Sequence, residues 1–278
     1  MTEIDAQTIK QQNREDWDHA APAWRKYDQN LRRGSEPLTR RLLEMAQIKP
    51  GQRVLDIASG TGEPGLPAAV IVGQSGSVLL TDQSQEMLAV AREKASAQGL
   101  RNVDFLVSDA QQLQLEPESF DAALCRGALQ LMPDPIAVLR VAFDALKPGG
   151  RIALSIVGRL AANPYFTLPF VVLRKYASLP PYDPVVRGDP DHLRTILSTA
   201  GFRDLHFETL ELIPMEFENG REYWEYSSGF SAAASVLSQI AADQHDRIGE
   251  EVAALAGGGN PNGKVALKSE ALLASGIK

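Results

Sequence analysis

Residues 53–65 read RVLDIASGTGEPG, and this stretch decides the fold. Its first five residues form a short run with apolar Val54, Leu55 and Ile57, bounded by glycine and proline, a pattern that predicts a short buried strand. Gly60, Gly62 and Gly65 follow, and glycine lets a backbone adopt positive φ and approach a ligand closely. A helix after such a turn directs its unpaired N–H groups toward whatever the turn holds. The stretch therefore predicts a ligand-binding turn between a strand and a helix.

Strands and helices alternate from residue 51 to residue 157. Strands are predicted at 53–57, 77–81, 102–107, 120–125 and 151–157, and helices at 84–98, at 135–146 and after the glycine turn to about 72. This alternation predicts right-handed βαβ units and a doubly wound parallel sheet. Such sheets bind ligands beyond the carboxyl ends of their strands, at the switch point. The polar residues expected there are Asp56, Ser59, Asp82, Asp109 and Arg126.

The parts that flank this core carry most of the aromatic residues. Residues 1–35 place Trp17, Trp24 and Tyr27 on one helical face, which predicts a helical segment that packs on the domain or covers its ligand site as a lid. Residues 36–278 are expected to form one domain with cap insertions at about 160–187 and 215–262. The further elements predicted in it are a helix at 36–49, a helix at 189–200, a strand at 202–213, two helical segments within 221–255 and a last strand at 265–277.

Composition limits the classes of protein that this chain could be. The 278 residues include 44% hydrophobic and 23% charged residues, typical of a globular protein. The one cysteine, Cys125, lies in an apolar run and is expected to be a buried strand residue, which excludes an internal disulfide and fits a cytoplasmic location. The polar N-terminus does not read as a signal peptide, and no apolar run predicts a membrane span. The net charge of −7 argues against a nucleic-acid partner, and no spacing of His, Asp or Glu indicates a metal.

Two nucleotide ligands are consistent with the glycine turn. Gly60-x-Gly62-x-x-Gly65 matches a dinucleotide fingerprint, and Asp82 follows where such proteins place a ribose-binding acid, so an NAD-dependent oxidoreductase is one alternative. Asp56, however, lies inside the first strand, where a carboxylate opposes a pyrophosphate and suits a cationic ligand. A ligand with an amino group, a ribose and an adenine also suits Asp109 at the end of the third strand. S-adenosylmethionine is such a ligand.

Five stretches in order resemble the class I S-adenosylmethionine-dependent methyltransferases, and the likeness covers about residues 10–215. They are VLDIASGTGEPG, LLTDQSQEMLAVAREKA, SDAQQL, FDAALCRGALQLMPDP and LKPGGRIALSIV. The ubiquinone/menaquinone-biosynthesis type of small-molecule methyltransferase is the most similar group. The resemblance implies a Rossmann-like sheet of seven strands, the last of them inserted antiparallel and placed in Ala266–Ile277. From the residues alone, that last strand is expected to be an edge partner of the strand at 202–213.

The resemblance also implies roles for individual residues. It assigns Asp56, Ala58, Gly60 and Gly62 to the methionine part of the cofactor, and Ser59 and Thr61 belong to the same turn. It assigns Asp82 to the ribose, Gln83 and Met87 to the sugar and adenine, Asp109 and Ala110 to the adenine, and Arg126 to the methionine carboxylate and methyl-donor side. Helix capping is an alternative role for Asp82 and Asp109, and a structural ion pair is one for Arg126.

The implied reaction is in-line displacement at the sulfonium methyl group, with S-adenosylhomocysteine as product. Positioning supplies most of the rate, and a general base is needed only for a protonated, weakly acidic acceptor. The candidate bases are His19, His192, Tyr223 and Glu225. The acceptor pocket is expected among residues 10–30, 160–187 and 215–255, whose aromatic content indicates a small, partly hydrophobic acceptor. A non-catalytic cofactor-binding protein is a further alternative, and the sequence is compatible with a monomer or a homodimer.

Overall fold

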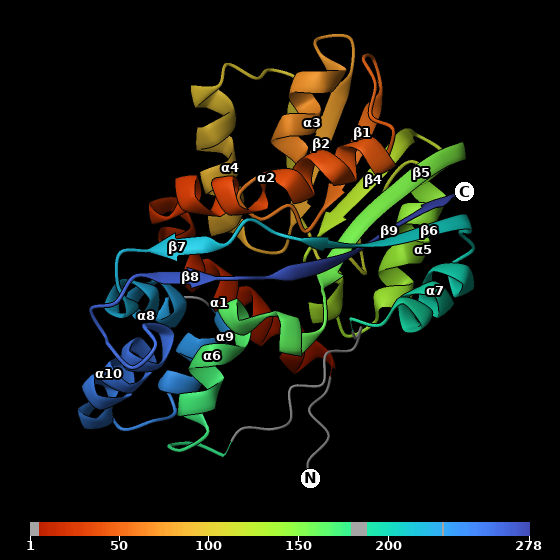
Figure 1. Cartoon of the computed structure of the whole chain (residues 1–278). Helices are drawn as coiled ribbons and strands as arrows, with labels where there is room; N and C mark the ends of the chain where they lie inside the picture. Colours follow the sequence, from red (N-terminus) through yellow and green to blue (C-terminus); the bar gives the residue numbers. More distant parts are fainter. Residues whose placement is uncertain (1–5, 179–187, 230) are drawn as a thin grey trace.

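The computed structural model describes residues 6–178, 188–229 and 231–278 of the chain. In this part, seven strands form one sheet in the order β3-β2-β1-β4-β5-β9-β6 (Figure 1). These strands are β1 (Arg53–Ile57), β2 (Ser77–Asp82), β3 (Val103–Val107), β4 (Phe120–Arg126), β5 (Leu146–Val157), β6 (Arg203–Glu211) and β9 (Glu270–Ile277). β9 runs antiparallel to both of its neighbours, while β1 to β5 pair in parallel. The predicted Rossmann-like sheet with an antiparallel last strand is confirmed.

The position of β9 in the sheet differs from the expected edge position. β9 lies between β5 and β6, and all of residues 271–276 are buried. A strand that is covered on both faces reads as a continuous apolar run, which ALLASG is, whereas an edge strand alternates. β6 takes the edge instead. The predicted strand at 265–277 is also interrupted, because β8 (Val265–Leu267) pairs with β7 (Met215–Phe217) in a separate two-stranded sheet.

Helices cover both faces of the large sheet. On one face, α2 (Asp28–Met45), α3 (Gly65–Val72) and α4 (Gln85–Ala97) pack apolar side chains against β1, β2 and β4. On the other, α5 (Pro135–Ala145) and α7 (Pro190–Thr199) pack against β4, β5 and β9, with Cys125 buried among them. Two cores on either side of one sheet are the doubly wound arrangement that the βαβ pattern predicts. Both cores leave the carboxyl ends of the strands free for a site.

The N-terminal segment consists of two helices. α1 (Ala6–Lys26) lies along α4, where Ala20 and Ala21 contact Met87 and Val90. The helix predicted at 36–49 is α2, which begins at Asp28, so the predicted boundary between residues 35 and 36 falls inside a helix. α2 begins eight residues earlier because its apolar face continues there to Leu31, which contacts the buried Tyr27 cluster. Of these two helices, α2 contributes to one of the cores that sandwich the sheet, and α1 packs outside them.

The second half of the chain adds a helical cap with a core of its own. It comprises α6 (Pro164–Leu173), α8 (Gly220–Ser228), α9 (Ser231–Leu237) and α10 (His245–Ala256), together with β7 and β8 (Figure 1). The first cap stretch contains a helix, α6, because its prolines include one at the helix start, where no N–H is needed. The second cap stretch contains three helices, α8, α9 and α10, where the sequence predicted two helical segments. Part of the first predicted insertion, residues 179–187, lies outside the described residues.

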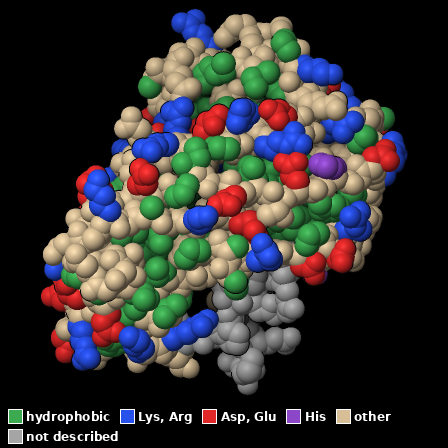
Figure 2. All heavy atoms as spheres, viewed as in Figure 1, with side chains coloured by type: hydrophobic (Ala, Val, Ile, Leu, Met, Phe, Trp, Pro, Cys, Tyr) green, Lys and Arg blue, Asp and Glu red, His purple; other side chains and the backbone are tan. Residues whose placement is uncertain are grey.

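Short 3-10 turns complete the described chain at η1 (Leu129–Leu131), η2 (Leu160–Ala162) and η3 (Ala242–Gln244). Acidic and basic side chains are interspersed on the face shown in Figure 2. Ion pairs such as Arg41–Glu208 and Arg33–Glu216 join α2 to β6 and β7. Within the described residues, we find no helix with the length and apolar character that crossing a membrane requires.

Candidate functional site

The glycine turn joins β1 to α3 and has the backbone geometry that the sequence predicts. Gly60 has φ +53° and Gly62 has φ +99°, in the left-handed region that disfavours other residues. A Cβ atom at Gly60 would meet no heavy atom within 4 Å, so this position opens onto free space. The turn can therefore bring its backbone directly against a ligand at Gly60.

The buried side chain of Asp56 lies behind this turn and contacts Gly65 at its end. This side chain is fully buried, and Oδ2 accepts a hydrogen bond from the backbone N–H of Gly65 at 2.8 Å. Oδ1 is also buried and has no hydrogen-bond partner among the described residues. Burial raises the pKa of the Asp56 carboxyl to about 8. A cationic group nearby would stabilise the ionised form of this buried carboxyl, whose Oδ1 has no partner among the described residues.

Asp82, the last residue of β2, binds the same turn from the side. Its Oδ2 accepts from the N–H of Gly60 at 2.8 Å, and its Oδ1 accepts from the N–H of Ser84 at 2.9 Å. Ser84 is the N-cap of α4, because its hydroxyl accepts from the N–H of Met87. Burial raises the pKa of Asp82 to about 6. The predicted alternative, a capping role, is thus partly present: Asp82 orients both the turn and the start of α4.

One cavity lies at the carboxyl ends of β1, β2, β3 and β4. Its lining residues are Lys10, Asn13, Trp17, Trp24, Ala58, Ser59, Gly60, Thr61, Glu63, Asp82, Gln83, Met87, Ser108, Asp109, Ala110, Gln111, Arg126, Gly127, Ala128, Leu131, Met132 and Pro133. The predicted cofactor residues are among them except Asp56 and Gly62, which lie behind the turn. The structure therefore brings together residues from four separate strand ends that the sequence assigned to one ligand.

Helix α1 forms the outer wall of this cavity. Lys10 Nζ lies 2.7 Å from Asp109 Oδ2, and the Asn13 side chain donates to the carbonyl oxygen of Leu131. Trp17 and Trp24, whose rings meet edge to face, line the same wall. Lys10 and Asn13 were missed as site residues. They precede Trp17 by seven and four residues, the spacing of one helical face, and that spacing is the signal that could have found them.

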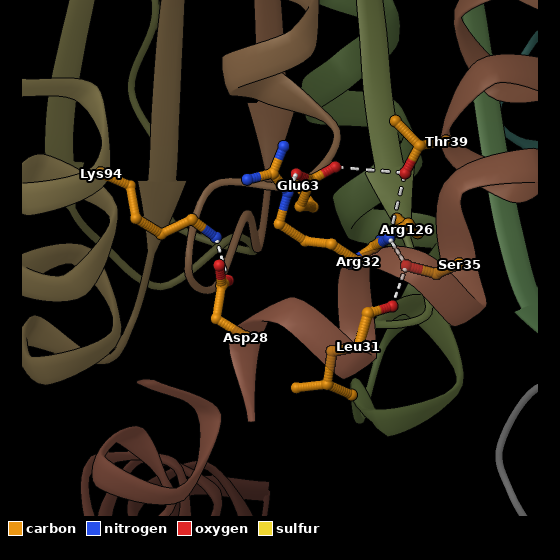
Figure 3. Close-up of polar contacts among 8 residues, drawn as sticks. All are labelled: Asp28, Leu31, Arg32, Ser35, Thr39, Glu63, Lys94 and Arg126. Carbon is orange, nitrogen blue, oxygen red and sulfur yellow. Dashed lines mark hydrogen bonds and ion pairs between the residues drawn. The ribbon is translucent and has the colours of Figure 1, made fainter. Parts of the chain in front are cut away.

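Arg126, at the end of β4, directs its guanidinium toward α2 (Figure 3). Its Nη1 donates to the hydroxyls of Ser35 and Thr39, at 2.9 and 3.1 Å. Thr39 in turn donates to Glu63, which also lies 3.4 Å from Arg32. Among the described residues, the hydrogen-bond partners of Arg126 are neutral hydroxyls, while the nearby carboxylates of Glu63 and Asp56 favour its charged form without a direct ion pair. Arg126 lines the cavity, and its role there remains a prediction.

The four candidate general bases lie away from this cavity. His19 contacts the carbonyl oxygen of Glu15 on α1, and His192 lies on α7. Glu225 is exposed and paired with Lys26, and the buried Tyr223 donates its hydroxyl to the carbonyl of Tyr165. None of these four side chains belongs to the cavity lining formed by the described residues.

The aromatic residues of the cap also lie elsewhere. Tyr165, Phe217, Tyr223 and Tyr226 pack with Tyr27 in the separate cap core, and the hydroxyls of Tyr165 and Tyr226 contact each other. Burial raises the pKa of Tyr165, Tyr223 and Tyr226. In the described chain, the cavity lining draws on residues 10–24 but on none of the described residues of 160–187 or 215–255. Of the three stretches expected at the acceptor pocket, the first alone contributes to this cavity.

The cavity residues fit the cofactor that the sequence suggests. Gly60 leaves open space where a side chain would stand, and the buried Ser59 Oγ has no hydrogen-bond partner among the described residues. Carboxylates at Asp82 and Asp109 lie at successive strand ends, where hydroxyl and amino donors of a nucleoside can bind. In the searched part of the chain, no group of three or more His, Cys, Asp or Glu residues could hold a metal ion.

Comparisons with known proteins agree with this geometry. Residues 48–175 match the family model described as a methyltransferase domain. The chain is 36% identical over 144 residues to aklanonic acid methyltransferase DauC from Streptomyces sp. (strain C5), a match that covers 51% of this chain and 66% of that protein. It is 31% identical over 183 residues to the ubiquinone/menaquinone biosynthesis C-methyltransferase UbiE from Serratia proteamaculans, covering 60% of this chain and 73% of that protein.

Among solved structures, phosphoethanolamine N-methyltransferase 2 from Haemonchus contortus, in complex with S-adenosylhomocysteine, shares the fold. The TM-score is 0.52 at 22% identity, and the match covers 91% of this chain and 52% of that chain. The chain belongs to the class I S-adenosylmethionine-dependent methyltransferases. Its cofactor is S-adenosylmethionine, and the NAD-dependent alternative is not favoured.

Proposed function

We propose that the protein transfers the methyl group of S-adenosylmethionine to a small, partly hydrophobic acceptor. One observation carries this proposal: the cavity that holds the predicted cofactor residues continues along an apolar wall. Trp17 and Trp24 from α1 and Leu131, Met132 and Pro133 after β4 form that wall. Pockets for small organic molecules have this composition, mostly apolar with a few placed polar groups.

In this proposal each strand end binds a different part of the cofactor. Asp82 accepts hydrogen bonds from the ribose hydroxyls, and Asp109 accepts one from the adenine amino group. The turn residues Ser59, Gly60 and Thr61 approach the methionine part, and the unpartnered Oδ1 of Asp56 attracts its ammonium group. Arg126 supplies the positive charge for the methionine carboxylate, since its present partners are hydroxyls. The bound cofactor supplies the electrophilic methyl group.

The protein's contribution to rate is then positioning and exclusion of water. The side chains of α1 close the cavity, and holding a nucleophile in line with the methyl group is worth several kcal/mol of barrier (about 7–11 kcal/mol in well-oriented model reactions). Because the four candidate bases lie outside the cavity lining, the acceptor that fits best reacts through an atom that is already ionised or strongly nucleophilic. The names of DauC and UbiE support small organic acceptors.

The proposal is tested by turnover. The purified protein is incubated with S-adenosylmethionine and a panel of phenols, quinols, aromatic carboxylic acids and amines, and the S-adenosylhomocysteine formed is measured. We expect turnover with an acidic aromatic acceptor, and a much lower rate in the Asp82→Ala variant when the cofactor concentration is near the wild-type Kd. Cofactor binding without turnover on any member would instead support a non-catalytic cofactor-binding protein. Heat of binding with NADH alone would support the oxidoreductase.

A cytoplasmic location remains part of the proposal, in line with the single, unpaired Cys125.

A further inference from the structure

Lys10 occupies a position in the cavity that the proposed function gives to the cofactor. Its ammonium lies 2.7 Å from Asp109 Oδ2, and its side chain is only 15% exposed. The other oxygen of the same carboxylate, Oδ1, accepts from the backbone N–H of Gln111 at 2.9 Å. Both oxygens of Asp109 are therefore bound within the chain, although Asp109 lines the cavity.

The Lys10 ammonium and the adenine amino group offer the same chemistry to Asp109. Each is a nitrogen that donates a hydrogen bond to a carboxylate oxygen. We propose that Lys10 is an internal competitor for the adenine end of the cofactor site: it binds Asp109 Oδ2 in the cofactor-free protein and yields this oxygen to the adenine amino group. This inference rests on the proposed function, because it takes Asp109 as the adenine partner.

The local structure lets Lys10 move while α1 stays in place. Lys10 lies near the beginning of α1, and its ammonium stands at the end of a flexible four-carbon stem. Farther along the helix, Asp18 accepts a hydrogen bond from the Ser84 hydroxyl at 2.5 Å, and Arg25 pairs with Glu93 at 2.8 Å. These contacts hold α1 on α4 independently of Lys10. Exchange at Asp109 therefore needs a change of one side chain and leaves the tryptophan wall intact.

Replacing Lys10 should raise the affinity of the protein for S-adenosylhomocysteine. In Lys10→Met, Asp109 Oδ2 is free before the cofactor arrives, so S-adenosylhomocysteine is expected to bind about two- to fivefold more tightly, as suits a partly exposed ion pair. Stopped-flow fluorescence of Trp17 and Trp24 would show the gain as faster association. Lys94→Met is a matched control, because Lys94 pairs with Asp28 at 2.6 Å with 13% and 27% exposure, against 15% and 27% for Lys10 and Asp109 (Figure 3). The affinity of Lys94→Met for S-adenosylhomocysteine should equal that of the wild type.

Two results would overturn the proposal that Lys10 competes with the adenine amino group. Weaker binding and faster dissociation in Lys10→Met would show that Lys10 clamps the bound cofactor, and an affinity equal to that of Lys94→Met would show that Lys10 does not compete; either overturns the inference. Lys10→Ala, with circular dichroism as a check of folding, repeats the test with a smaller side chain.

A second ligand distinguishes a failure of the Lys10 exchange from a failure of the proposed cofactor site. S-inosylhomocysteine carries a 6-oxo group in place of the adenine amino group, so it presents an acceptor to Asp109 at the position where adenine presents a donor. If the wild type binds both ligands equally, Asp109 is not the adenine partner, and the proposed site and the exchange both fall. If the wild type prefers S-adenosylhomocysteine at least tenfold and Lys10→Met shows no gain, the exchange alone is wrong.

Discussion

The carboxylate of Asp82 accepts a hydrogen bond from the backbone N–H of Gly60, at 2.8 Å. This contact joins the end of β2 to the glycine turn after β1, two elements that meet only at the carboxyl edge of the sheet. Asp82 therefore has two roles in the proposed site. It orients the turn that approaches the cofactor, and it offers a carboxylate to the ribose.

We expect Asp82→Ala to weaken S-adenosylhomocysteine binding by one to two orders of magnitude. Loss of charged hydrogen bonds costs about 1.5–3 kcal/mol, and the freed N–H of Gly60 adds to the loss. Isothermal titration calorimetry measures the change. Asp104→Ala, which removes an exposed carboxylate of β3 outside the cavity lining, is the control and should bind like the wild type. Unchanged affinity in Asp82→Ala would remove Asp82 from the ribose site.

Gly60→Ala should separate backbone strain from ligand contact. The positive φ of Gly60 costs a non-glycine residue on the order of 1–2 kcal/mol of stability, and the new methyl group would stand in the open space of the cavity. Gly99→Ala is the matched control, because Gly99 has φ +68°, equally open surroundings and no place in the cavity lining. Urea unfolding should show a similar loss of stability in both variants. Cofactor affinity should fall at least tenfold in Gly60→Ala only; equal affinity in the two would mean that the turn is not the cofactor contact.

The buried Asp56 predicts a pH dependence of stability. Its pKa is raised by burial from 3.8 to about 8, so the folded protein holds this proton while the unfolded chain has released it. Stability of the cofactor-free protein should therefore fall as pH rises from about 4 to 8, by at most about 1.4 kcal/mol per pH unit for this one proton. Asp82, with a pKa of about 6, contributes only to the lower half of this range.

Urea unfolding at pH values between about 6.5 and 8 isolates the contribution of Asp56. Asp56→Asn can still accept the hydrogen bond from Gly65 but cannot titrate, so the decline with pH should be smaller in this variant. The same slope in the variant and the wild type would show that Asp56 is ionised throughout this range.

The four candidate bases should prove dispensable for methyl transfer. His19→Gln, His192→Gln, Tyr223→Phe and Glu225→Gln remove groups that do not line the cavity, so kcat is expected to stay within about twofold of the wild type. Tyr223→Phe should cost about 1 kcal/mol of stability, because it removes the hydrogen bond to Tyr165. A drop of about a hundredfold or more in kcat for any one of them would identify that residue as a general base.

The central sheet could be predicted from the sequence because its signals are local. The parallel strands contain short, mainly apolar runs, and polar residues lie at or just after their carboxyl ends, as Asp82 does in β2 and Asp109 does after β3. The place of β9 could not be predicted in the same way, because pairing with β5 and β6 depends on contacts far apart in the chain. The start of α2 at Asp28 was missed because polar residues such as Arg32 and Arg33 cover its outer face.

For the site, the carboxylates at strand ends were predictable because parallel strands bring their carboxyl ends to one edge. Asp56 shows the limit of this reasoning. A sequence position inside a strand does not say which side of the turn the carboxylate lies on, and the structure places it behind Gly65. Lys10 and Asn13 were not singled out within residues 10–30, because their spacing to Trp17 marks a shared helical face but does not say which part of the sheet that face crosses.

A crystal structure with S-adenosylhomocysteine would test directly whether the cavity at the ends of β1 to β4 is the cofactor site, with adenosine bound by Asp82 and Asp109. We expect ribose hydroxyls on the Asp82 carboxylate, the adenine amino group on Asp109 and the Lys10 ammonium displaced from Asp109. A cofactor bound outside this cavity, or one whose adenosine contacts neither carboxylate, would contradict this assignment.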